Sequence, residues 1–414
     1  MEDNIQPLTR SPHPTMSHTI EKTPALGADP FSSESLRDPF RFQRELRDAG
    51  SVVRLEKYGI YAVGRFEETK AILSDHLRFT TTAGVGLSDI RDPGSWRVKN
   101  PLLEIDPPDH TAIRMVLLKY LSPAVVRGLA SMFQKEAEVM VESLLDKGSV
   151  DGMRDVAEPY VCTVFPRTVG ITVEREKVLQ FGDLNFNANG PQNELYWASF
   201  RQVEPLLPWL EEKFQRHSMV PGGVGEQIYG AEAAGALPPG TALGLVRVLF
   251  RGGFDTTIAG IAAALEQLAR NPQQWDALRA NPTLAAAAFA EALRHASPAQ
   301  VMFRTTRPGG VELGGQTLEG DVKIAAFIGA ANRDPVRWAS PDVFDITRQT
   351  AGHLAFGAGA HVCLGLMIAR LEAESVLTAL ARRVARLELD GPVEHRLVNT
   401  LRTHAKLPLR VIPA

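Results

Sequence analysis

The chain has 414 residues, of which 44% are hydrophobic and 22% are charged, and its formal net charge is −3. This composition is typical of a soluble globular protein, and the small net charge excludes a general attraction to nucleic acid or to membrane surfaces. Its two cysteines, Cys162 and Cys363, cannot build a disulfide framework, and no CxxC pair indicates a zinc site. The sequence shows neither a signal peptide nor a run of about 20 apolar residues, so we expect a cytoplasmic protein.

The first quarter of the chain begins with a predicted tail and continues with alternating helix and strand signals. Residues 1–28 contain four prolines and no apolar segment, and they are expected to be flexible. Residues 29–414 are expected to form one large domain. In chain order this domain starts with a helix over 34–49, a hairpin over 52–63 that turns at Gly59, a helix over 66–73 and a polar loop over 80–99. Such a loop is a common place for contacts to a ligand.

Most of the middle of the chain has helical periodicity. The pattern runs from Asp106 to about residue 270 and ends in the longest predicted helix, 241–269. Another helix is predicted over 282–296, strands with glycine turns over 301–327, a helix over 366–377 and further strands up to residue 411. The sequence therefore predicts a mainly α fold with small β-sheets.

A glycine-rich stretch, residues 353–365, carries the second cysteine directly before a predicted helix. A thiolate at Cys363 would be stabilised by the free N–H groups and the positive dipole end of that helix. The glycines allow the backbone to pass close to a flat and bulky group. A lone cysteine more often has a structural role than a functional one. The residues around Cys363 are therefore needed to distinguish the two roles.

Those neighbours are Phe356, Gly357, Gly359, His361, Cys363 and Gly365. Their spacing, Phe-Gly-x-Gly-x-His-x-Cys-x-Gly, resembles the haem-binding loop of the cytochrome P450 superfamily. The resemblance implies the cytochrome P450 fold, with Cys363 as the axial thiolate ligand of haem b. It also implies that Phe356 packs near the sulfur and that Gly357 and Gly365 border the porphyrin. Thiolate ligation favours cleavage of the O–O bond.

A second segment, residues 252–257, lies inside the longest predicted helix. Two glycines in mid-helix each cost about 1 kcal/mol relative to alanine, which a purely structural helix would rarely retain. The segment resembles the oxygen-activating part of the central helix in the superfamily, where an acid and an alcohol deliver protons. The resemblance assigns these catalytic roles to Asp255 and Thr256.

Helical spacing sorts the residues around this pair into two stripes. Val248, Gly252 and Thr256 share one face and are expected to line the haem pocket. Arg247, Arg251 and Asp255 form the adjacent stripe, so Arg251 is expected to form an ion pair with Asp255 four residues later. The alternative is that Arg251 controls proton delivery by the acid or binds an anionic substrate.

Two further constellations acquire roles from the resemblance. Glu291 and Arg294 match the ExxR pair behind the haem, and Arg348 matches the arginine that completes a triad for folding and haem retention. His110, Arg114, Arg304 and His361 match the groups that bind the two haem propionates, which need hydrogen-bond donors when they are buried.

The resemblance implies that one atom of O2 enters a substrate and the other leaves as water. No flavin or ferredoxin module is visible, so the expected electron donors are a separate iron–sulfur ferredoxin and its reductase, with the enzyme acting as a monomer. The alternatives are a peroxygenase and a haem-based sensor or binding protein. Asp255 and Thr256 argue against both, because neither function needs a proton relay.

Three segments, 84–89, 187–191 and 399–402, resemble bacterial enzymes that oxidise para-substituted benzoic acids. The chain departs from them at Ala83, Val248 and Asn189, where an arginine, a serine and a phenylalanine are expected. We predict a small aromatic substrate, a benzoate or methoxylated phenol, that undergoes O-demethylation or hydroxylation; the alternative is a tailoring hydroxylase of a larger metabolite. The predicted substrate contacts are Leu87, Ser88, Phe186, Asn189, Arg247, Val248, Arg251, Gly252, Ala299, Met302 and Leu401.

Overall fold

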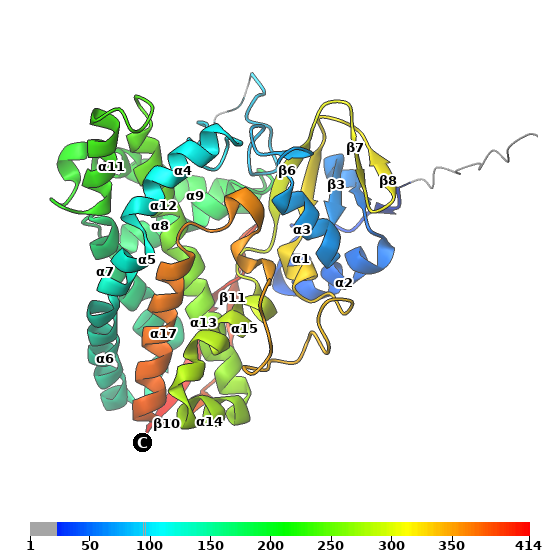
Figure 1. Cartoon of the computed structure of the whole chain (residues 1–414). Coiled ribbons are helices and arrows are strands. Elements are labelled where there is room, and N and C mark those ends of the chain that lie inside the picture. Colours follow the sequence, from blue (N-terminus) through cyan, green and yellow to red (C-terminus); the bar gives the residue numbers. More distant parts are fainter. Residues whose placement is uncertain (1–22, 94, 96) are drawn as a thin grey trace, which may run out of the picture.

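The computed structural model describes residues 23–93, 95 and 97–414, and it divides the chain into a helical part and a smaller β-rich part (Figure 1). The main sheet has the strand order β1-β2-β3-β9-β6-β4. Its strands are β1 (Ala25–Leu26), β2 (Val53–Leu55), β3 (Ile60–Val63), β4 (Phe79–Thr80), β6 (Met302–Thr306) and β9 (Lys323–Ala326). Strand β1 pairs in parallel with β2, so the folded part begins before residue 29. Residues 1–22 of the predicted tail lie outside the described residues.

The predicted hairpin at the centre of this sheet is confirmed. Val53 pairs with Ala62 and Leu55 pairs with Ile60, while Gly59 takes the left-handed conformation that the turn requires, with a φ of 63°. Strand β3 then pairs with β9, and β9 pairs with β6. The sheet therefore joins the first and last thirds of the chain, and helices α1 (Ser33–Arg37), α2 (Pro39–Ala49) and α3 (Phe66–Ser74) lie beside it (Figure 1).

The helical part is built around α13 (Asp255–Arg270), of whose 16 residues 13 are buried. It packs against α15 (Ala285–Ala296) and α17 (Leu366–Arg383), the helix that follows the cysteine loop (Figure 1). The surrounding helices are α4 (Asp109–Tyr120), α5 (Pro123–Gly128), α6 (Ala130–Lys147), α7 (Glu158–Val169), α8 (Arg175–Asn187), α9 (Glu194–Val203), α10 (Leu207–Lys213), α11 (Val224–Ala233), α12 (Ala242–Gly253), α14 (Pro272–Ala280) and α16 (Ile328–Ala331). The mainly α prediction is confirmed.

The helix predicted over 241–269 is present as two consecutive segments, α12 and α13, which are separated by one residue. Phe254 lies between them with a φ of −93° and a ψ of −74°, at the edge of the right-handed helical region. Gly252 and Gly253, which directly precede it, are weak helix formers and lower the cost of the interruption. The combined segment Ala242–Arg270 is long and apolar enough to cross a membrane, but it is mostly buried inside the protein, as expected for a core helix.

The remaining predicted elements occur near their expected positions. The β signals over 301–327 become β6, β9 and the small hairpin of β7 (Val311–Leu313) and β8 (Gln316–Leu318). At the C-terminal end, β10 (Val384–Leu389), β13 (Pro408–Pro413) and β5 (Ser149–Asp151) form a three-stranded sheet. Strands β11 (Glu394–Arg396) and β12 (Thr403–Lys406) form a separate hairpin.

Candidate functional site

The cysteine loop ends in a geometry that supports a thiolate. The backbone N–H groups of Gly365 and Leu366 donate hydrogen bonds to the Cys363 sulfur, and the N–H of Cys363 itself donates to the Phe356 carbonyl at 2.8 Å. Burial raises the pKa of the Cys363 thiol, while these two donors and the nearby Arg114 guanidinium act in the opposite direction. Although protein atoms surround the thiol, Cys363 as a residue is solvent-exposed, whereas Cys162 is only half-exposed. Cys363 is therefore placed to bind a group lying against the loop.

Two glycines of this loop have positive φ angles for different reasons. Gly357 has a φ of 72° and its virtual Cβ would lie 3.7 Å from the nearest described atom, the His361 carbonyl oxygen. A Cβ at Gly359, with a φ of 69°, would lie only 2.6 Å from the Cα of Ser74 at the end of α3. Gly359 thus serves close packing of the loop on α3, whereas Gly357 and Gly365 leave space beside the cysteine.

The two glycines at the end of α12 also differ. A Cβ on Gly253 would lie 1.8 Å from the Phe165 ring of α7, so this glycine is required for helix packing. A Cβ on Gly252 would meet no atom of the described residues within 4 Å. The Thr256 hydroxyl donates to the Gly252 carbonyl at 2.8 Å, which confirms that the two residues are neighbours on one face. That face, on which Val248 also lies, borders open space at Gly252.

Asp255, the first residue of α13, has its carboxyl group pressed against α8. A Cβ on Gly182 would lie 1.9 Å from Oδ1 of Asp255, so only glycine fits there. Burial and the neighbouring Asp183 together raise the pKa of Asp255 to about 7, although Arg396 opposes the shift. Asp183 and Arg396 form an ion pair at 3.1 Å. The carboxyl group is therefore suited to exchange a proton near neutral pH.

Gly182, Asp183 and Arg396 were missed by the sequence analysis. They lie on α8 and β11, far from Asp255 in sequence, and none belongs to a recognisable motif. A fourth missed residue is Glu372 on α17, which is fully buried and lies beside the Thr257 hydroxyl. Burial raises its pKa well above the usual range of a glutamate.

The predicted ion pair between Arg251 and Asp255 does not form. Because the helix is interrupted at Phe254, the two residues no longer share one regular helical stripe. The Nε of Arg251 instead donates to Oδ1 of Asn185 on α8 at 2.5 Å, and the Asn185 amide donates to the Arg251 carbonyl at 3.1 Å. Within the described residues, its two terminal nitrogens have no hydrogen-bond partner. This arrangement favours the alternative interpretation, in which Arg251 controls proton delivery by the acid or binds an anionic substrate.

The electrostatic surroundings of Arg251 are unfavourable for a cation. Burial lowers its pKa to about 10, and repulsion from Arg97 contributes to the shift. Glu104 attracts the Arg251 charge, but it is already paired with Arg97 at 2.9 Å. Arg251 is thus a half-buried guanidinium without a carboxylate of its own in the described part of the chain.

The four residues expected to bind propionates lie together beside the cysteine loop. The rings of His110 and His361 are 4.1 Å apart, and Arg304 is 4% exposed. Both nitrogens of His110 and the Nε2 of His361 are buried without a hydrogen-bond partner among the described residues. Burial and the neighbouring cations lower the pKa of His110 to about 4 and that of His361 to about 3. These unsatisfied donors and Arg114, which donates to the Val362 carbonyl at 2.6 Å, fit a group carrying two carboxylates.

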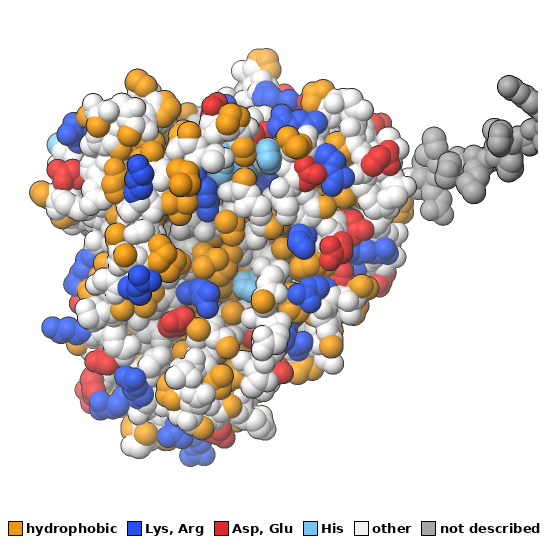
Figure 2. Space-filling model, in the orientation of Figure 1, with side chains coloured by type: hydrophobic (Ala, Val, Ile, Leu, Met, Phe, Trp, Pro, Cys, Tyr) orange, Lys and Arg blue, Asp and Glu red, His pale blue; other side chains and the backbone are white. Residues whose placement is uncertain are grey.

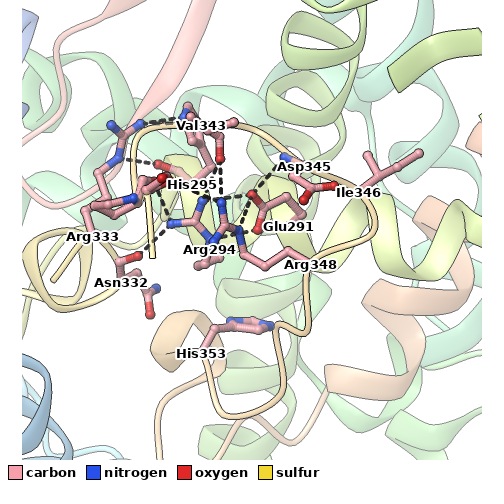
Figure 3. A network of polar contacts seen from close by, with 12 residues as sticks. Glu291, Arg294, His295, Asn332, Arg333, Val343, Asp345, Ile346, Arg348 and His353 are labelled. Carbon is pink, nitrogen blue, oxygen red and sulfur yellow. Dashed lines mark hydrogen bonds and ion pairs between the residues drawn. The ribbon is translucent and has the colours of Figure 1, made fainter. Parts of the chain in front are cut away.

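The Glu291, Arg294 and Arg348 triad has the contacts that were expected of it (Figure 3). Glu291 accepts from Arg294 at 2.7 Å and from Arg348 at 3.1 Å, and both members of the first pair are completely buried. Arg294 also donates to the Asn332 carbonyl at 2.9 Å, and the Asn332 side chain accepts from the N–H of Leu354 at 2.7 Å. The triad is thereby connected to the start of the cysteine loop.

Some of the predicted substrate contacts are brought together by the fold and others are not. Phe186 and Leu401 pack with Ala259 and Val398 in a small apolar cluster, and Ala299 pairs with Leu401 through a β-bridge. The N–H of Leu87 donates to the Asn189 carbonyl at 2.9 Å. Met302 begins β6, two residues before Arg304. Val248 is buried on α12.

Two predicted contacts point elsewhere. Arg247 forms an ion pair with Glu211 of α10 and lies over the Phe214 ring, so its guanidinium already has an acidic partner. Ser88 is exposed on the loop before α4. Of the two arginines on α12, only Arg251 therefore has a guanidinium that is available to bind an anion.

Comparison with known proteins gives consistent results. A family model described as Cytochrome P450 matches residues 236–387. The cytochrome CYP199A2 of Rhodopseudomonas palustris is 46% identical over 393 residues, which cover 94% of this chain and 95% of the relative. A biotin biosynthesis cytochrome of Bacillus subtilis is 28% identical over 93% of this chain and 99% of its own length.

Solved structures share the fold over almost the whole chain. CYP109Q5 from Chondromyces apiculatus superposes with a TM-score of 0.77 at 30% identity, covering 94% of this chain and 98% of that one. P450BioI in complex with an acyl carrier protein gives a TM-score of 0.80 at 25% identity, with coverage of 92% and 99%.

Proposed function

Because this chain belongs to the cytochrome P450 superfamily and is a haem-thiolate monooxygenase, we propose that it inserts one atom of O2 into a small aromatic acid or phenol. The reaction would be O-demethylation or hydroxylation at the position opposite the acidic group. The observation that carries the proposal is Arg251, a half-buried guanidinium without a carboxylate of its own among the described residues.

Proteins of this family bind haem through a cysteine thiolate, and the residues present here fit it. Cys363 would hold the iron, while the unpartnered ring nitrogens of His110 and His361 and the guanidinium groups of Arg114 and Arg304 would face the two propionates. Bound in this way, the haem supplies the activation of O2. The N–H groups of Gly365 and Leu366 lower the charge density on the sulfur, and such hydrogen bonds tune the reduction potential.

Asp255 and Thr256 are proposed to supply the protons that the reaction consumes. With a pKa of about 7, Asp255 can release a proton and regain one at neutral pH. Thr256 offers a hydroxyl on the neighbouring face of the helix, where Gly252 leaves space. Asp183 and Arg396 are partly exposed at 22% and 29%, and they can connect the buried acid with water.

An aromatic carboxylate would satisfy Arg251 in two ways. Its charge would neutralise the guanidinium, and its two oxygens could accept from the free terminal nitrogens. The ring is proposed to pack against the apolar cluster of Phe186, Ala259, Val398 and Leu401, which includes two of the predicted substrate contacts. The sequence resemblance to benzoate-oxidising enzymes supports the same class of substrate.

Spectral titration tests this proposal. Binding of 4-methoxybenzoate to the haem-loaded enzyme should shift the iron toward high spin, seen as a type I difference spectrum. Arg251→Gln should weaken that binding by about 10- to 100-fold, the range of a lost charge-assisted contact. The matched control is Arg247→Gln, since Arg247 lies one turn earlier but is already paired with Glu211. It should change the affinity by less than about twofold.

Three results would count against parts of the proposal. If no aromatic acid or phenol produced a spin shift, the substrate class would be wrong. If Arg247→Gln and Arg251→Gln weakened binding equally, Arg251 would not be the specific anchor. If 4-methoxybenzoate bound but was not converted to 4-hydroxybenzoate during reconstituted turnover, the reaction class would be wrong.

An iron–sulfur ferredoxin and its reductase are the proposed electron donors. Lys and Arg side chains are scattered over the face on which α17 lies, the face nearest the cysteine loop (Figure 2). Arg370 is one exposed residue of that helix. Such charges would steer a small acidic carrier, and the rate of reduction should fall as ionic strength rises. The cytoplasmic location and monomeric state remain predictions.

A further inference from the structure

A group of potential metal ligands lies at the β11–β12 hairpin, outside the haem site. His395 of β11 and His404 of β12 are direct cross-strand partners, and their rings are 4.7 Å apart. Both face Glu266 of α13, the long buried helix. A register shift between Glu394 and His395 accompanies this pairing, and β-bulges commonly re-aim side chains in this way.

The ligand atoms converge on one point. Nε2 of His404 lies 2.8 Å from Oε2 of Glu266, and Nε2 of His395 lies 3.9 Å from the same oxygen. One ligand atom from each of the three side chains lies within 4.8 Å of the others. A metal ion at bonding distances of about 2.0–2.2 Å needs its ligands about 3 to 4 Å apart, so little movement is required.

We propose that Glu266, His395 and His404 form a Zn²⁺ site that ties the β11–β12 hairpin to α13. Two imidazoles and one carboxylate are a ligand set that zinc accepts, with a water as the fourth ligand. The other oxygen of Glu266 accepts from Nε of Arg270 at 2.8 Å, a contact that would orient the carboxylate. The ion can enter from solvent at His395, whose side chain is 19% exposed and has no hydrogen-bond partner within the described residues.

The charges near Glu266 determine which metal ion the proposed site favours. Arg270 and Arg402 both lie close enough to influence Glu266, so the carboxylate charge is already balanced. Mg²⁺ and Ca²⁺ depend on several oxygen ligands and would bind poorly beside two arginines. Zinc gains most of its affinity from the imidazole nitrogens and is the ion that this arrangement favours.

The test uses the haem-loaded enzyme, stripped of loosely bound metal with a chelator and dialysed against dilute ZnCl2. Elemental analysis should find about one zinc per haem iron, and X-ray absorption at the zinc edge should show scattering from two imidazoles. His395→Ala, at a half-buried position that the fold tolerates, should weaken zinc binding by more than the roughly 10- to 100-fold typical of a lost outer partner. Mg²⁺ at the same concentration should not displace zinc.

His217 and Glu212 provide a matched control. They form a surface pair that has no third potential metal ligand beside it among the described residues. His217→Ala should leave the zinc content and affinity unchanged. Zinc binding that is equal in the wild type and in His395→Ala, or an enzyme without zinc after this dialysis, would overturn the proposal and leave a hydrogen-bonded Glu–His pair. Because the readout is metal content, it stands apart from any result on aromatic substrates.

Discussion

The triad behind the cysteine loop and the junction between α12 and α13 both hold charged side chains away from water. In the triad, Glu291 faces two arginines, and Arg294 uses its remaining nitrogens on backbone carbonyls such as that of Asn332 (Figure 3). At the junction, Asp255 lies beside another acid and Arg251 has only an amide partner. The charges of the triad, which stabilise the fold, are paired with opposite charges. The charges at the junction, which are proposed to act on a ligand or a proton, form no ion pair among the described residues.

The largest predicted effect breaks the matched region. Glu291→Gln leaves Arg294 and Arg348 without their carboxylate, and breaking a buried ion pair costs about 3–5 kcal/mol. The free energy of unfolding and the haem content should both fall, as measured by urea titration and the pyridine haemochrome assay. The control is Glu194→Gln, which removes an exposed pair with Arg201 and should cost less than about 1 kcal/mol. Equal losses in the two variants would contradict the distinction.

The next effect concerns Asp255 and depends on pH. Its pKa is raised from 3.8 to about 7 in the folded state, so the folded protein binds the proton more tightly than the unfolded chain. The stability from this proton is fully present below the unfolded pKa and is lost as the pH rises through about 7. From pH 5 to pH 8 this loss amounts to about 2–3 kcal/mol.

Asp255→Asn removes the titrating group, so its free energy of unfolding should rise relative to the wild type by that amount as the pH goes from 5 to 8. Turnover should fall by about 10²- to 10⁴-fold, the usual contribution of a positioned acid or base. Denaturant titrations at several pH values give the first result and product formation gives the second. A stability difference that does not change with pH would contradict the raised pKa.

A smaller effect separates the two glycines of the junction. Gly253→Ala places a methyl group against the Phe165 ring and should destabilise the protein by about 1–3 kcal/mol. Gly252→Ala meets no described atom and should stabilise the helix by up to about 1 kcal/mol. Gly252→Ala should nevertheless weaken binding in the space that Gly252 borders, measured as a reduced spin shift. Equal changes in the free energy of unfolding for Gly252→Ala and Gly253→Ala would contradict the difference between the two glycines.

The fold class and the cysteine loop were predictable because they depend on local patterns. Periodicity predicted the hairpin at Gly59 and the strands after residue 301, and motif spacing predicted the triad that Arg348 completes. The helical period of the apolar residues over 241–269 predicted the positions of α12 and α13, although it did not mark the single-residue interruption at Phe254.

The environment of Asp255 and Arg251 could not be predicted in the same way. Gly182 and Asn185 come from α8, Arg396 comes from β11, and Arg97 comes from the loop before α4, so their proximity exists only in three dimensions. The ion pair between Arg251 and Asp255 failed because regular spacing was assumed across a break. The substrate prediction depends on the same contacts, which is why sequence patterns limited it to a class.

The contact between Gly182 and Asp255 makes the acid strength of one side chain depend on the separation of two helices. The Asp255 carboxyl lies directly against the backbone of α8 at Gly182, with no side chain between them. Any displacement of α8 from α13 would admit water to this carboxyl and return its pKa toward that of an ordinary aspartate. The infrared carbonyl band of protonated Asp255 would therefore serve as a built-in gauge of that separation, and a ligand that moves α8 would change its intensity at constant pH.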